Sequence, residues 1–164
     1  MIDKQKGYVL IEILLGLALT GILAAGIATF TIQTFTESSK SNSRMQALMQ
    51  AQNVGHWLSR DVQMSSNITL GESAGFPINL LWVDIDQNEY QASYTIADGE
   101  IKRNLTKNDE EPVQMLIAQD INTAPELTSC NYTDGGLFTL NVTATHGNND
   151  VSETYIIKKR LDLQ

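Results

Sequence analysis

The sequence predicts an α+β protein in which one long N-terminal helix packs on an antiparallel β-sheet. Two observations support this prediction. No proline interrupts residues 8–66, where apolar residues first form an unbroken run and then recur every three or four positions, as on one face of a helix. From residue 67 onward, short segments alternate apolar and polar residues and are separated by turn sequences, as in half-buried strands.

Charge is distributed very unevenly along the chain. The 164 residues carry a formal net charge of −8, whereas residues 67–164 alone carry −9. This acidic balance argues against a protein that binds nucleic acid through general basicity, so we expect no direct nucleic-acid partner. The single Cys130 excludes an intrachain disulfide framework and a cysteine-cluster metal site, and two histidines leave little for a histidine-rich centre. We therefore predict neither a metal nor a cofactor.

The first element expected is a membrane-crossing helix over residues 8–36. From Ile13 to Thr36 there are 24 consecutive uncharged residues, and about 20 helical residues span the ~30 Å hydrocarbon layer of a bilayer. One alternative is a buried core helix. Another is a cleaved secretory signal, for which Ala24, Ala25 and Ala28 would supply small residues near a cut. The apolar run is much longer than the ~7–15 residues that such a signal requires.

Glu12 stands immediately before this uncharged run. A carboxylate inside an apolar helix costs about 2.5–3.5 kcal/mol at the centre of a membrane and less near an end, and such residues usually have a cationic partner. No basic residue lies within residues 8–31, and Lys4 is about two helical turns away. Glu12 is therefore either a functional residue that meets a cation outside the helix or a side chain that reaches the headgroup layer.

The residues from Lys6 to Ala24, KGYVLIEILLGLALTGILA, resemble the N-terminus of bacterial type IV prepilins and pseudopilins. The shared signature is a short basic leader ending in glycine, an aromatic residue, a glutamate fifth in the mature chain and a long apolar helix. Tyr8 stands where phenylalanine is usual. The resemblance is specific over residues 4–30 and only architectural beyond them.

The resemblance implies a processing and assembly mechanism. A prepilin peptidase would cut between Gly7 and Tyr8, which makes residues 1–7 a leader peptide, and would methylate the new amino terminus on Tyr8. That amine and Glu12 would both lose water in a filament core, where together they can be tolerated. Glu12 of an incoming subunit would thus meet the amine of a neighbour and set the axial register.

The helix is expected to continue over residues 37–66 as an amphipathic segment. The prediction places Arg44, Gln52, Arg60 and Asp61 away from the apolar stripe and makes His56 and Trp57 core or boundary residues. The stripe consists of Met45, Leu48, Ala51, Val54, Leu58 and Val62.

Residues 67–164 are expected to form an acidic head of about five or six strands. Residues 90–96 and 101–105 alternate on either side of Asp98-Gly99, a strong hairpin turn. Residues 80–83, 115–121 and 138–144 are further candidate strands. A loop over residues 146–150 is expected to lead to a last strand near residues 154–161.

The head contains little that suggests catalysis. Residues 84–88 (DIDQN) begin like a calcium loop, but glycine is missing at the sixth position and Thr95 stands where the final glutamate belongs, so a solvated acidic loop is the better interpretation. Cys130 has no neighbouring base in the sequence. We assign no catalytic residue and predict that the protein is not an enzyme.

The function predicted is that of a minor pilin or J-type minor pseudopilin, a filament subunit of a type IV pilus or a type II secretion machine. Its expected partners are prepilin peptidase, other pilin or pseudopilin subunits and the inner-membrane assembly platform. We expect a single-pass protein of the cytoplasmic membrane with its head outside the cytoplasm, later incorporated into a filament. The alternative is an uncleaved membrane anchor that presents an extracytoplasmic binding domain. The sequence does not separate pilus, secretion and DNA-uptake systems.

Overall fold

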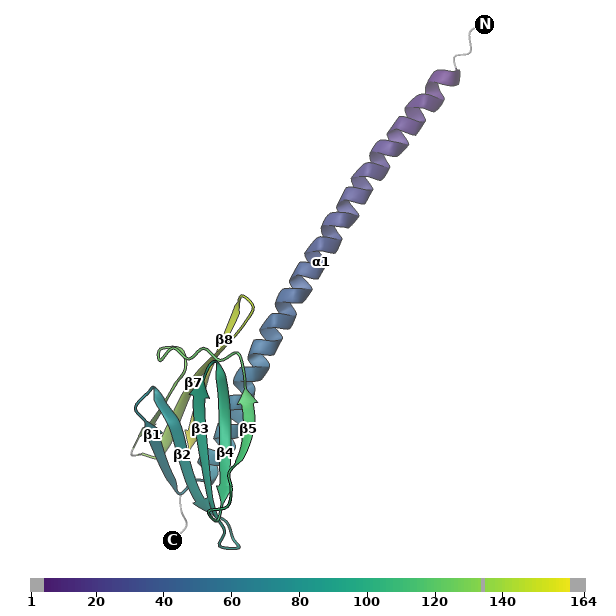
Figure 1. The fold of residues 1–164 in the computed structure, drawn as a ribbon. Helices are drawn as coiled ribbons and strands as arrows, with labels where there is room; N and C mark the ends of the chain where they lie inside the picture. The colour runs from purple at the N-terminus through teal and green to yellow at the C-terminus, as the bar shows by residue number, and fades with distance from the viewer. Residues whose placement is uncertain (1–4, 134, 160–164) are drawn as a thin grey trace. The chain divides into compact units, whose positions relative to one another are not determined.

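The computed structural model describes residues 5–133 and 135–159, with side chains from Leu10 onward. It confirms the α+β class: one long helix precedes strands that all pair antiparallel (Figure 1). The helix is α1 (Gln5–Met64). The strands are β1 (Asn67–Gly71), β2 (Gly75–Val83), β3 (Glu89–Ala97), β4 (Glu100–Lys107), β5 (Val113–Ala118), β6 (Ser129–Thr133), β7 (Leu137–His146) and β8 (Asn149–Lys158).

The strands form two sheets, where one was expected. The larger sheet has the order β1-β2-β3-β4-β5 and the smaller has the order β6-β7-β8, so each strand pairs with its neighbour in the sequence. The predicted turn at Asp98-Gly99 is confirmed. It joins β3 to β4, and both residues have positive φ angles, 52° and 75°, as the tight hairpin turn requires.

Two strands were missed, and one predicted loop is wrong. β1 and β6 are short, and each contains only one buried apolar residue, Ile68 or Cys130, which leaves a weak alternation. Residues 146–150, expected as a loop, lie mostly in paired strands, because His146 of β7 pairs with Asn149 of β8. Gly147, with φ of 59°, allows the chain to reverse within two residues. The end of the predicted last strand, from residue 160, lies outside the described residues.

The chain divides into two compact units, Met1–Asn42 and Ser43–Gln164. In the second unit, one face of α1 is buried against the sheets as the apolar stripe predicts. Two details of that prediction are wrong: Met45 is exposed, and Asp61 is fully buried. His56 is also exposed rather than a core or boundary residue, whereas Trp57 is half-buried as expected.

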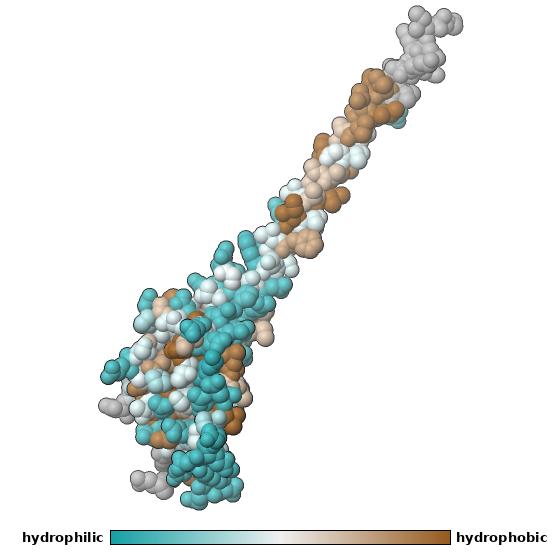
Figure 2. All heavy atoms as spheres, viewed as in Figure 1, coloured by the Kyte–Doolittle hydropathy of each residue, from teal (hydrophilic) through white to brown (hydrophobic). Residues whose placement is uncertain are grey.

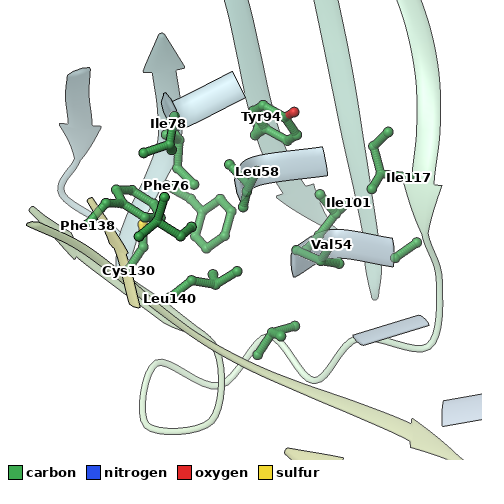
Figure 3. Close-up of a cluster of buried hydrophobic side chains, with 14 of the residues drawn as sticks. Val54, Leu58, Phe76, Ile78, Tyr94, Ile101, Ile117, Cys130, Phe138 and Leu140 are labelled. Carbon is green, nitrogen blue, oxygen red and sulfur yellow. The ribbon is translucent and has the colours of Figure 1, made fainter. Parts of the chain in front are cut away.

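The hydrophobic core of the second unit combines side chains from α1 and both sheets. Val54 and Leu58 of the helix lie between residues of the larger sheet and residues of the smaller one (Figure 3). Fully buried apolar side chains within this core include Ile78, Tyr94 and Ile101 from the larger sheet, and Phe138 and Leu140 from the smaller one. Each fully buried aliphatic or aromatic side chain contributes about 1.5–3 kcal/mol, so this layer supplies most of the driving force for folding the head.

Asp61 explains why a charged residue lies on the buried face of α1. Its Oδ2 accepts hydrogen bonds from the Tyr94 hydroxyl and from Arg103 Nε, each at 2.6 Å, and Arg60 pairs with its Oδ1 at 3.0 Å. Burial and the negative Asp61 raise the pKa of Tyr94. Burial opposes the charge on Arg103, but the hydrogen bond and charge of Asp61 outweigh it and raise its pKa. Both groups therefore stay protonated and donate to the carboxylate.

Two glycines are required by close approaches within the head. A Cβ on Gly55 of α1 would stand 2.1 Å from Cζ of Tyr155, whose ring in β8 packs against the helix there. Gly75 has φ of 88°, and a Cβ there would lie 2.4 Å from Sγ of Cys130. The helix tolerates the ~1 kcal/mol intrinsic cost of a glycine at position 55 because this glycine lets the smaller sheet pack closely.

Replacing Asp61 with alanine is expected to lower the free energy of unfolding of the head by about 3–5 kcal/mol, because Arg103 would remain buried without its partner. The measurement is guanidinium unfolding of the full chain in detergent, followed by the fluorescence of Trp57 and Trp82, which both lie in the second compact unit. Lys102→Ala is the matched control. It removes the exposed ion pair with Glu100 from the same strand and should cost at most about 1 kcal/mol. Equal losses in the two variants would contradict the anchoring role of Asp61.

Candidate functional site

The N-terminal part of α1 exposes a continuous apolar surface. Every described side chain from Leu10 to Asn42 is exposed, and the large apolar ones keep more than half of their surface accessible, for example 66% for Leu17 and 73% for Phe35. Figure 2 shows apolar colouring along most of this part of the helix. Soluble proteins rarely expose apolar patches above a few hundred Å², so a surface of this kind marks contact with a membrane or with other proteins.

The length of this apolar surface matches a bilayer. Among the described residues there is one helix long and apolar enough to cross a membrane, and it lies near the N-terminus. Its 24 uncharged residues extend over about 36 Å at 1.5 Å per residue, slightly more than the ~30 Å hydrocarbon layer. The helix therefore has the length and composition of a single membrane span.

The threonines in the apolar run satisfy their own hydroxyl groups. Each of the five donates to the backbone carbonyl four residues earlier; the bond from Thr20 to Gly16, for example, is 2.7 Å long. A hydroxyl bonded in this way needs no partner from water. The run therefore presents few unsatisfied polar groups, a property that suits both lipid and the packed interior of a helical assembly.

Glu12 is the one charged residue of this surface between Leu10 and Thr36. Its side chain is exposed near the start of the described part of α1. Among the described side chains, the basic residue nearest to it in the sequence is Lys40, which forms an ion pair with Glu37 at 3.5 Å. A cation for Glu12 must therefore come from the leader residues, from a new amino terminus or from another molecule.

The predicted processing site lies at the beginning of α1. Gly7 and Tyr8 belong to the backbone of the helix, but the side chain of Tyr8 lies outside the described residues. Cleavage between Gly7 and Tyr8, methylation of Tyr8 and the assembly role of Glu12 stay predictions from the sequence.

Hydrogen bonds within the acidic loop between β2 and β3 hold its conformation. Asp84 accepts hydrogen bonds from the backbone amides of Asp86 and Asn88 and from the Asn88 side chain, at 2.8–2.9 Å. The hydrogen bonds from Asn88 lower the pKa of Asp84. Within the described part of the chain, no group of three or more histidine, cysteine or acidic residues could hold a metal ion.

Cys130 is a buried structural residue of β6. Burial raises the pKa of its thiol to about 12, so almost none of it is the reactive thiolate at neutral pH. In comparisons with known proteins, no family model, no curated protein and no solved structure matches the chain.

The exposed apolar helix predicts different behaviour for the full chain and for residues 43–164. In Triton X-114 phase separation, the full chain should enter the detergent phase, because its first helical segment buries apolar surface there. Residues 43–164, which contain the core and carry most of the acidic charge, should remain in the aqueous phase and unfold cooperatively. A full-length chain that is a monodisperse monomer without detergent would contradict this interpretation of the surface.

Proposed function

We propose that this protein is a minor subunit of the type IV pilin and pseudopilin class. It is inserted in the cytoplasmic membrane as a precursor, cleaved after Gly7, N-methylated on Tyr8 and assembled into a filament through its apolar helix. The observation that carries the proposal is the combination of Glu12 with the 24 uncharged residues that follow it on an exposed helix. The KGYVLIE sequence places this glutamate at the fifth position after the glycine, as in the prepilin signature.

The exposed helix suits a subunit that changes its surroundings. Before assembly, lipid covers the apolar side chains of residues 13–36. In a filament, the same side chains pack against helices of neighbouring subunits. Because the threonine hydroxyls bond within their own helix, neither environment leaves them unsatisfied. The move from lipid to filament then exchanges one apolar environment for another, at little desolvation cost.

Glu12 supplies the specificity that apolar contacts lack. A carboxylate without a partner costs several kcal/mol when water is removed, and so does a protonated amine. Cleavage after Gly7 creates such an amine at Tyr8, only four residues from Glu12. When the amine of one subunit and Glu12 of the next lie together, each neutralises the other. An axial displacement of either helix would leave two uncompensated charges in an apolar core.

The other parts of the proposal follow from this membrane helix. Prepilin peptidase and the inner-membrane assembly platform are the partners that process and move the subunit, and other pilin or pseudopilin subunits surround it afterwards. The acidic head lies outside the cytoplasm, and its charge of −9 disfavours direct contact with nucleic acid.

The role of Glu12 can be tested against Glu37, a second glutamate of the same helix that lies beyond the uncharged run. Glu12→Ala and Glu37→Ala should both reach the membrane and lose the leader in the source bacterium. The fraction of Glu12→Ala recovered in filaments, or cross-linked to other subunits, should fall at least tenfold, while Glu37→Ala should match the unmodified protein.

A Glu12→Ala protein that is processed and assembles normally would refute this role. An uncleaved membrane anchor, the alternative function, makes a different prediction. Its precursor keeps residues 1–7, and neither substitution affects incorporation into any filament.

A further inference from the structure

The strand β5 is an unusually open edge of the larger sheet. It pairs with β4 on one side and is the last strand in the sheet order (Figure 1). Its first four residues are all exposed, and three of them are apolar: Val113 is 66% exposed, Met115 41% and Leu116 49%. The sequence of β5, VQMLIA, contains no charge. An edge strand presents a row of unpaired backbone N–H and C=O groups on which another strand can form.

The other described sheet edges are protected in ways that β5 is not. β8 carries Asp150, Glu153 and Lys158 along its length. β1 lies beside β6, and the backbone amide of Cys130 in β6 donates to the carbonyl of Ala74 in the turn after β1, at 2.9 Å. Charges and covering elements of this kind are the usual protection of an edge strand. The first four residues of β5 have neither.

The register of β5 identifies which of its side chains a new strand would cover. Met115 lies directly opposite Arg103 of β4, so the two side chains share the face of the sheet that is turned toward α1. Trp57 of the helix stacks on the same Arg103, with the guanidinium carbon 5.2 Å from the ring centroid. An added strand would continue this face of the sheet beyond Met115, and its inward residues would cover exposed apolar surface there.

The charges near β5 indicate the kind of partner. Asp109, Glu110 and Glu111 are exposed immediately before the strand, and Pro112 has no N–H to donate, so pairing begins at Val113. A second copy of the chain is a poor occupant. Antiparallel pairing of two β5 strands would bring these acids near Asp120, which follows β5, of the other copy, between heads that each carry −9. A basic residue in a different protein would meet the same acids favourably.

We propose that β5 is a docking edge for an extended segment of another protein, which adds as a sixth, antiparallel strand. The segment has apolar side chains at alternate positions, which cover Val113 and Met115, and lysine or arginine at its C-terminal end, beside Asp109, Glu110 and Glu111. Backbone hydrogen bonds to residues 113–116 hold it in register. This inference does not depend on cleavage at Gly7 or on Glu12.

The test uses a synthetic probe peptide in which threonine and valine alternate over eight residues and the C-terminus carries Lys-Lys. The full chain in detergent micelles is titrated with the labelled probe, and fluorescence anisotropy and hydrogen exchange of residues 113–118 are measured; empty micelles are the blank. Binding should slow exchange in β5. A matched probe ending in Glu-Glu should bind at least tenfold more weakly, because like charges would face each other.

Two further comparisons distinguish strand addition from non-specific adsorption of the probe. N-methylation of one alternate set of probe residues removes the N–H groups that face β5 and should abolish binding, whereas methylation of the other set should leave it nearly unchanged. Val113→Lys should weaken binding of the Lys-Lys probe at least tenfold, because it places a charge on the face that the probe covers. Ile156→Lys, at an apolar residue of β8 that is 68% exposed, should not.

Several results would overturn the proposal. They are the absence of binding to the folded chain, equal affinity for the Lys-Lys and Glu-Glu probes, equal loss with both N-methylated sets, and equal sensitivity to Val113→Lys and Ile156→Lys. Self-association of the full chain in detergent through β5, detected by sedimentation and removed by Val113→Lys, would show that the occupant is a second copy and would also overturn it.

Discussion

The buried carboxylate of Asp61 is the interaction on which the arrangement of the head depends. It receives hydrogen bonds from Tyr94 of β3 and Arg103 of β4, and so fixes the second half of α1 against the larger sheet. A buried ion pair adds little net stability, but removing one of its members leaves the other charge buried without a partner, which is strongly destabilising. It therefore selects one rotation and one axial position of the helix on the sheet. The apolar residues on the same face, such as Val54 and Leu58, then fill the core between the two sheets.

Asp61 and Glu12, both on α1, are subject to the same constraint: a carboxylate removed from water needs a cationic partner. Asp61 finds its cation inside the chain, in Arg103, and the head is complete with it. Glu12 lies on an apolar surface that contributes nothing to the described core, and no basic side chain described within 20 residues can compensate it. A carboxylate in such surroundings calls for a partner from outside. In the proposed function, cleavage after Gly7 would create an amino terminus with the charge and the position to supply it.

The sequence predicts the large features of the fold well because each has a strong local cause. The uncharged run, the absence of proline and the Asp98-Gly99 turn all act within a few residues. The details that were wrong depend on residues far apart in the sequence. The sequence pattern places Asp61 on the polar face, but the sheet brings Tyr94 and Arg103, 33 and 42 residues away, into contact with it. Similarly, the role of Gly55 becomes evident only when Tyr155 packs on it. Processing at Gly7 and Tyr8 and the assembly role of Glu12 stay predictions from a sequence motif, since the chemistry they would serve requires a second molecule.

The most direct test of the proposed function is the mass of the mature N-terminus. The protein is isolated from membranes of cells with an active prepilin peptidase, and its intact mass and N-terminal peptide are determined by mass spectrometry. The pilin proposal predicts a chain that begins at Tyr8, lacks residues 1–7 and carries one added methyl group on its amino terminus. A chain that retains Met1 and is unmethylated would contradict it and would leave an uncleaved membrane anchor as the function.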